Sequence, residues 1–196
     1  MDGEIQLLIR WIHVIAGIVW VGHLYFFNFV NMPLQGVLDD AGKKAVNPHL
    51  MPRALWWFRW GAMITFLAGL TLFYLMYMKG GLIHEAEGGL SMRAKWIMMG
   101  MTLGIIMWFN VWFIIWPAQK KLLGGTAGDA APALRKRAML ASRTNTFLSA
   151  PMLFGMVVSS HVAGVSSCTM SVMAALSLLV IWAAIKSSSN VGKSVN

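Results

Sequence analysis

Three histidines lie inside or at the edge of strongly apolar stretches of the sequence. His13 and His23 belong to the first stretch, and His161 stands near the end of the fourth. An ionisable or metal-ligating side chain at membrane depth is costly, so it usually faces a protein interior and marks a site. Imidazole is also a common axial ligand of haem iron. These residues predict a haem held by His13, with His161 or Lys95 as the second ligand.

The same residues also have a structural interpretation. His13 can be a neutral histidine that is hydrogen-bonded to a carbonyl oxygen across the bundle. His161 can be a hydrated side chain at the membrane interface. Lys95 can extend its ammonium group to the interface and anchor the helix there. Gly17, one turn from His13, and Trp20, two turns away, share its helical face, and the glycine leaves room for a flat ring. Ligand and structural interpretations both stay open on the residues alone.

A second polar cluster is predicted deeper along the first stretch. His23 follows His13 by about 15 Å at about 1.5 Å per residue, and it is a candidate ligand for a second cofactor. Arg59, in WWFRW, lies at a similar depth. Its guanidinium can snorkel to the cytoplasm, serve an anion or a propionate, or stack on a neighbouring tryptophan. The cluster is completed by Asn28, Asn31 and Asn110.

Apolar blocks of about twenty residues, the length of a membrane-crossing helix, must position these side chains. The chain has 196 residues, 58% hydrophobic and 12% charged, whereas about a quarter of a soluble domain is charged. One all-α domain over residues 1–196 is predicted, an integral membrane helical bundle of about five transmembrane helices. Pro117 is expected to end the third and Pro151 to kink the fourth. The predicted spans are 7–30, 54–78, 95–116, 145–165 and 172–185.

The distribution of Lys and Arg gives the predicted orientation. Twelve of the sixteen basic residues belong to one side of the five spans, counting loops, tail and span ends, and four belong to the other side. The positive-inside rule then places the N-terminus outside, the C-terminus in the cytoplasm, and the loop 118–144 in the cytoplasm with a short helix around 131–140. The net charge of +9 is attributed to this bias and not to nucleic acid. We expect a multi-pass protein of the bacterial inner membrane, whose first span is retained because the acidic start lacks a secretory signal.

Several kinds of chemistry lack their motif. Cys168 is the single cysteine and has no CxxC or CxxCH neighbour, which leaves covalent c-type haem and structural zinc unsupported. GxSxG, HExxH and GxGxxG elements are absent from the sequence, and Asp and Glu are confined to its tails and loops. A buried carboxylate pair for acid–base catalysis is therefore not expected.

Four long segments carry a resemblance to a known family. They are WIHVIAGIVWVGHLYFFNFVN (11–31), RALWWFRWGA (53–62), MWFNVWFIIWPAQK (107–120) and SRTNTFLSAPMLFGM (142–156). They resemble the membrane domain of the cytochrome c-coupled urate oxidases, or urate hydroxylases, known as the urate oxidase N-terminal domain. The resemblance implies an inner-membrane protein linked to urate oxidation and to cytochrome c.

Full-length members of that family continue into a periplasmic cytochrome c domain, which this sequence lacks. The chain is therefore expected to pass electrons to a separate cytochrome c or to act inside a larger complex. A shorter likeness links His13, Trp20 and Lys95 to the membrane protoporphyrinogen oxidases, which share an early histidine, a W-x-x-x-L-Y/F-like stretch and a lysine that opens a later span. That likeness agrees with a porphyrin near His13.

Three functional hypotheses follow. The first is a b-type haem redox protein that transfers electrons to cytochrome c. The alternative is a cofactor-free accessory subunit of a respiratory or monooxygenase complex, joined to other membrane subunits or to copies of itself in the lipid bilayer. The third is an oxidoreductase acting on urate or a porphyrin, with Arg59 and Asn110 among the residues that can receive a planar anion.

Overall fold

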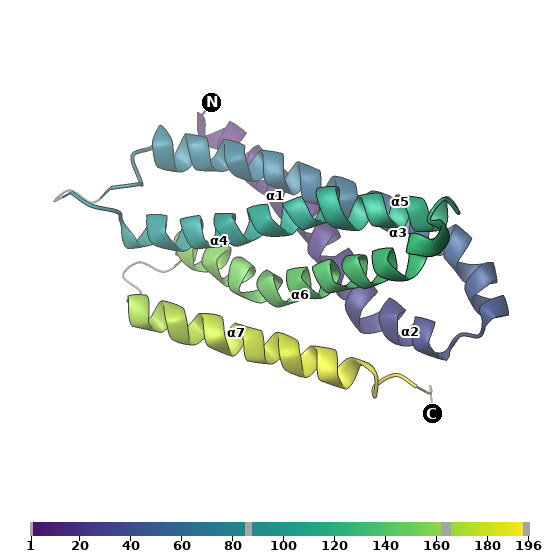
Figure 1. Ribbon diagram of the computed structural model, residues 1–196. Coiled ribbons are helices and arrows are strands. Elements are labelled where there is room, and N and C mark those ends of the chain that lie inside the picture. Colours follow the sequence, from purple (N-terminus) through teal and green to yellow (C-terminus); the bar gives the residue numbers. More distant parts are fainter. Residues whose placement is uncertain (1, 85–87, 162–165, 194–196) are drawn as a thin grey trace.

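Five long helices form an elongated bundle in the computed structural model (Figure 1), which describes residues 2–84, 88–161 and 166–193. The predicted all-α class is confirmed: over these residues the extended backbone pairs only in an isolated bridge between His84 and Leu90. The long helices are α1 (Asp2–Tyr25), α3 (Asp40–Phe73), α4 (Met92–Phe109), α6 (Ala131–His161) and α7 (Ser167–Ser188).

Two of the long helices continue through a π-helical segment into a further α-helix. Helix α1 continues through η1 (Phe26–Asn31) into α2 (Met32–Val37), and α4 continues through η3 (Asn110–Ile115) into α5 (Trp116–Leu123). Pro33 and Pro117 follow these segments closely. A proline ring clashes with the carbonyl one turn back and supplies no N–H, and the wider π turn accommodates both defects. The expectation that Pro117 ends the third span is therefore wrong, since the helix runs on to Leu123.

The helices extend beyond several predicted boundaries. Helix α3 begins at Asp40, where the Asp39 side chain accepts a hydrogen bond from the Gly42 N–H at 2.7 Å, and η2 (Tyr74–Met78) prolongs it. The predicted loop 118–144 is largely helical, because α5 covers its beginning and α6 its end. The helix expected around 131–140 is the start of α6 and not a separate element. A short η4 (Gly128–Ala130) lies between α5 and α6.

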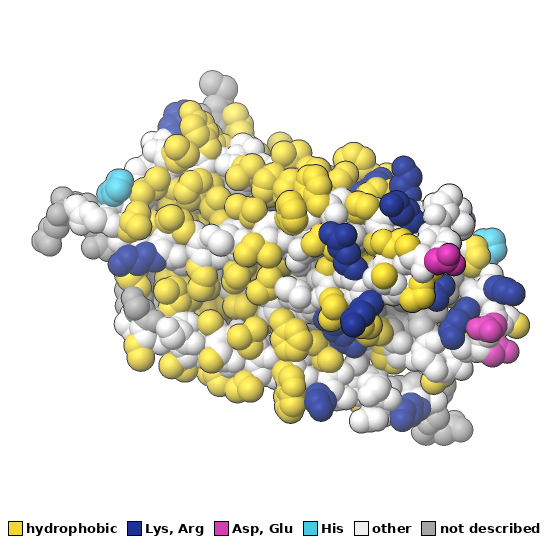
Figure 2. All heavy atoms as spheres, viewed as in Figure 1, with side chains coloured by type: hydrophobic (Ala, Val, Ile, Leu, Met, Phe, Trp, Pro, Cys, Tyr) yellow, Lys and Arg dark blue, Asp and Glu magenta, His cyan; other side chains and the backbone are white. Residues whose placement is uncertain are grey.

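Four helical segments are long and apolar enough to cross a membrane, which indicates a multi-pass membrane protein. They are Gly3–Val37, Asp40–Met78, Met92–Leu123 and Cys168–Ser188. Hydrophobic side chains cover the middle of the face shown in Figure 2, and many Lys and Arg gather towards one end. Which end faces the cytoplasm stays a prediction.

The fourth predicted span, 145–165, differs from the others. Its residues 162–165 lie outside those described, and the described part of α6 is not among the four apolar segments. Helix α6 instead buries polar side chains against its neighbours, namely Asn145, Thr146, Ser149 and Ser159. Its polar face is used inside the bundle, so a purely apolar surface is not required there.

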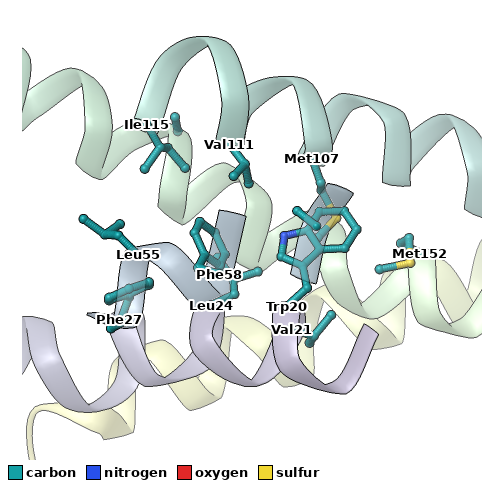
Figure 3. Packing of buried hydrophobic residues seen from close by; sticks show 13 residues of the cluster. Trp20, Val21, Leu24, Phe27, Leu55, Phe58, Met107, Val111, Ile115 and Met152 are labelled. Atoms are coloured by element: carbon teal, nitrogen blue, oxygen red, sulfur yellow. The ribbon is translucent and has the colours of Figure 1, made fainter. Parts of the chain in front are cut away.

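The core joins α1, α3 and the α4–α5 helix (Figure 3). Trp20 and Leu24 point from α1 towards Phe58 of α3 and Met107 of α4. At two helix crossings a glycine lets the two backbones approach closely. A Cβ on Gly61 would lie 3.1 Å from the Trp20 backbone nitrogen, and one on Gly155 would lie 3.0 Å from the Gly100 nitrogen.

Candidate functional site

His13 is held by a neighbouring helix. Its Nδ1 lies 2.9 Å from the carbonyl oxygen of Thr65 on α3. A carbonyl only accepts hydrogen bonds, so Nδ1 carries the proton and donates, and Nε2 keeps its lone pair. Metal-ligating histidines in proteins are commonly fixed in this manner, with the second ring nitrogen donating to a carbonyl. The structural alternative, a histidine bonded across the bundle, has the same geometry, so the contact alone does not separate the two.

A small cavity lies beside the imidazole. It has a volume of about 50 Å³ and is bordered by α1, α3, α4 and α6. Trp20, which is 2% exposed, lines it as expected for a residue on the His13 face. The Trp20 Nε1–H is buried without a hydrogen-bond acceptor. A buried donor of this kind is costly unless a ligand or water supplies the missing partner.

Gly69 is the glycine that fits against His13, and the sequence reasoning overlooked it. A Cβ there would stand 2.9 Å from the His13 Cε1 atom. Gly17, chosen from its helical spacing, has only the Thr65 methyl group near its missing Cβ, at 3.8 Å, and is not among the cavity-lining residues. Gly69 stands four residues after Thr65 on the same face of α3, and this spacing was the available signal.

The two predicted partners of His13 stand apart from the cavity. His161 is exposed at the end of α6, with Nδ1 2.9 Å from the Val157 carbonyl oxygen. Lys95 is exposed in the first turn of α4. Neither residue lines the cavity. Their role as ligands is thus an untested prediction that requires a rearrangement of this geometry.

Three methionine thioethers line the cavity. Met101 of α4 and Met152 and Met156 of α6 share it with His13. Thioethers act as axial ligands in cytochromes, where a methionine faces a histidine across the iron. The sequence shows sixteen scattered methionines, which are read first as packing residues. Only the tertiary arrangement brings these three to the histidine.

The residues of the cavity fit a haem in their chemistry and not in the present volume. An imidazole nitrogen, three thioethers and an unpartnered indole N–H are suited to a porphyrin iron and its edge. About 50 Å³ holds only a few water molecules. A porphyrin therefore requires the flexible methionine and Leu70 side chains to move outwards.

His23 lies in a different place, in a groove between α1 and α3. Its Nδ1 is 2.7 Å from the Val19 carbonyl oxygen of its own helix. The groove has a volume of about 540 Å³ and includes Arg53 and Trp57. Neither His13 nor Arg59 lines it. The sequence grouped His23 with Arg59, and the structure places them in different surroundings.

Arg59 is enclosed by tryptophan rings. Its Cζ lies 4.0 Å from the ring centroid of Trp116, 5.2 Å from that of Trp112 and 5.4 Å from that of Trp60. Stacking on a tryptophan was one of the predicted alternatives, and two of the three rings come from the α4–α5 helix, far away in sequence. The Nε atom of Arg59 is buried without a partner.

The predicted asparagines form a buried polar network with α6. Asn110 donates to Asn145 Oδ1 at 2.8 Å, and Asn145 donates to the Met107 carbonyl oxygen at 2.9 Å. Asn28 donates to the Leu24 carbonyl oxygen and to Ser142 Oγ, both at 2.9 Å. Asn31 bonds Gln35 instead. The bonds of Asn110 to Asn145 and of Asn28 to Ser142 link helices, whereas the contact of Asn31 stays within its own continuous helix.

The described residues contain no group of three or more His, Cys, Asp or Glu suited to a metal ion. A haem needs only one or two axial ligands from the protein, so this finding bears on metal clusters and not on haem. Of the predicted ligands His13, His161 and Lys95, His13 is the one that lines the cavity.

Comparison with protein families gives one match. A family described as urate oxidase N-terminal matches residues 35–85 and 82–195. No curated protein and no solved structure matches the chain. The matched residues cover most of the chain, although the histidines of α1 precede them.

Proposed function

The chain belongs to the urate oxidase N-terminal family, and from that premise we propose that it is a membrane redox protein that carries a haem b at His13. One observation carries the proposal: the His13 ring is fixed by the Thr65 carbonyl oxygen while its second nitrogen keeps a lone pair, and the residue lines a cavity. A haem b there would supply one-electron chemistry, with its potential set by the axial ligands and by burial.

The chain's own residues have distinct roles in this proposal. His13 ligates the iron, and the Thr65 carbonyl oxygen holds its ring and its tautomer. Trp20 donates its unpartnered N–H to the edge of the group. A methionine of the cavity, or His161 after a rearrangement, would supply a second ligand. The apolar walls exclude water from the site.

The electron partners are proposed from the family. The family's name points to urate as the electron source, and the notion of a separate cytochrome c as the acceptor rests on the resemblance described above. The bacterial inner membrane, with the N-terminus outside, is the location that this exchange requires. The four apolar helical segments support a membrane setting.

An optical spectrum of the purified chain tests the proposal. We expect a reduced-minus-oxidised difference spectrum with a b-type band, and loss of that band in His13→Ala. His49→Ala is the matched control, because His49 is exposed and lies outside the cavity. A preparation with no haem, or a band that persists in His13→Ala, would refute the assignment. Reduction of the bound haem by added urate would support urate as the electron source, and its absence would remove that part.

The alternative function, a cofactor-free accessory subunit, is favoured by one feature of the surface. Helix α7 leaves large apolar side chains exposed, including Leu179 at 60%, Val180 at 66% and Trp182 at 51%. Such a face suits either lipid or another membrane subunit. Stable co-purification with larger membrane partners, together with a haem-free chain, would favour this function.

A further inference from the structure

The groove beside His23 has the shape of a ligand site open to the bilayer. Its volume of about 540 Å³ is in the range of small-molecule sites, about 300–1,000 Å³. Its apolar walls include Phe26 and Leu50. Ile18 and Trp57 on its border are 63% and 55% exposed. Helices α1 and α3, which form the groove, belong to segments long and apolar enough to cross a membrane. In a membrane the groove would therefore open sideways towards lipid.

The hydrogen-bonding capacity of the groove is specific. Because His23 Nδ1 donates to the Val19 carbonyl oxygen, the neutral ring offers a lone pair at Nε2 and no second donor. Arg53 supplies donors at the same groove, and one of them is used by the His49 carbonyl oxygen at 2.5 Å. The groove therefore offers one acceptor and a cationic donor between apolar walls.

We propose that this groove binds the headgroup of a lipid-soluble hydroquinone. One quinol hydroxyl donates to His23 Nε2, and the opposite oxygen accepts from Arg53. The flat ring lies against the apolar walls, and its hydrocarbon tail leaves past Ile18 and Trp57 into the bilayer. The acceptor of His23 and the donors of Arg53 then each have a partner on the ligand.

A phospholipid fits the same groove less completely. Its phosphate would pair with Arg53, but an ionised phosphate offers acceptors only, so the phosphate itself cannot donate to His23 Nε2. A quinol satisfies both residues, and its ring fills apolar space that a phosphate cannot. Hydrogen-bond complementarity thus favours the quinol.

The inference goes beyond the proposed function and does not depend on it. His23 stands ten residues from His13 on the same helix, about 15 Å along the axis at about 1.5 Å per residue, and lines a separate hollow. Binding of a quinol at the groove can be measured whether or not a haem occupies the cavity at His13.

The test measures binding of decylubiquinol to the full chain. The chain is embedded in phosphatidylcholine nanodiscs under anaerobic conditions, and bound quinol is quantified by native mass spectrometry. We expect saturable binding to the wild-type protein, and at least about tenfold weaker binding in His23→Leu, which corresponds to the loss of one good hydrogen bond. His23→Gln should bind within about threefold of the wild type, because its amide oxygen replaces the acceptor.

Two controls test whether quinol binding is specific to the groove and to the hydroxyl donor. His49→Leu removes an exposed histidine outside the groove and should bind like the wild type. Oxidised decylubiquinone has no hydroxyl donor and should bind more weakly than the quinol to the wild-type protein. This second comparison needs no variant, so it remains decisive if His23→Leu fails to fold.

Three results would overturn the inference. The first is equal binding of quinol and quinone to the wild-type protein, or unchanged quinol binding in His23→Leu. The second is displacement of the quinol by phosphatidylglycerol at comparable concentration, which would assign the groove to an anionic lipid headgroup. The third is loss of a b-type haem band in His23→Leu, which would assign the groove to a haem. If the haem band is lost in His13→Ala and kept in His23→Leu, the result bears on the proposed function and not on the groove.

Discussion

Two histidines of helix α1 occupy contrasting sites. His13 is tied to another helix through the Thr65 carbonyl oxygen, whereas His23 is tied to Val19 within its own helix. The first lies beside a cavity bordered by four helices, and the second lies in an open groove between two. The same side chain on the same helix thus acquires its surroundings from its neighbours and not from its own segment.

The contrast has a chemical consequence. His13 faces groups that can ligate iron, namely three thioethers, in a space that needs side-chain movement to admit a large ring. His23 faces a roomy groove whose other polar side chain is the cation Arg53. Enclosure suits a tightly held cofactor, and an opening to lipid suits a ligand that exchanges with the bilayer.

The glycine crossing of α4 and α6 should affect the cavity and spare the groove. A Cβ in Gly155→Ala would lie 2.9 Å from the Trp96 carbonyl oxygen, a backbone atom that cannot move away cheaply. We expect a loss of about 1–3 kcal/mol in unfolding free energy and a lower haem content, since Met152 and Met156 flank this position. Thermal unfolding in detergent and haem absorbance measure both effects. Gly17→Ala is the control, because Gly17 does not line the cavity and the nearest atom to its added Cβ is the Thr65 methyl carbon at 3.8 Å. Equal effects of the two substitutions would contradict the account.

The buried asparagine pair should be the next most sensitive feature. Asn145→Ala removes the bond from Asn110 and the bond to the Met107 carbonyl oxygen. We expect a loss of about 1–2 kcal/mol in unfolding free energy, because both partners stay buried. Chemical unfolding followed by circular dichroism checks this value. Quinol binding at the groove should not change, and a large change there would show that the groove depends on this buried pair.

Gly69→Ala should separate cofactor binding from stability. The added Cβ meets the His13 ring at 2.9 Å, and the ring can rotate away. We therefore expect stability to change by less than about 1 kcal/mol while the haem band weakens or shifts. Gly22→Ala in the groove is the matched control, since nothing lies within 4 Å of its added Cβ. An unchanged haem spectrum in Gly69→Ala would argue against ligation by His13 in this orientation.

Thr65→Val should have the smallest effect. The hydroxyl bonds the Gly61 carbonyl oxygen of its own helix, whereas the contact to His13 uses the backbone oxygen of residue 65. The substitution leaves that backbone oxygen in place, so we expect a stability change within about 0.5 kcal/mol and an unaltered haem spectrum. A clear spectral shift would mean that the hydroxyl, and not only the carbonyl, takes part in the site.

Sequence patterns were sufficient for the helical class. They also located the first, second, third and fifth spans, each of which falls within an apolar helical segment of the structure. They failed at boundaries. Pro117 was taken as a helix end because proline removes a hydrogen bond, but the π-helical turn before it absorbs the defect. They also did not anticipate that polar side chains of the fourth predicted span, such as Asn145 and Ser149, are buried in the bundle.

The sequence by itself determined that costly histidines stand within apolar helices, because composition and spacing along one chain are enough to show it. Only the tertiary structure decided what each histidine meets. The Thr65 carbonyl oxygen, Gly69 and the cavity methionines come from other helices, and Arg53 reaches His23 from α3. Helical periodicity fixes the face on which a residue lies, whereas the crossing of helices at glycines such as Gly61 and Gly155 fixes which faces touch.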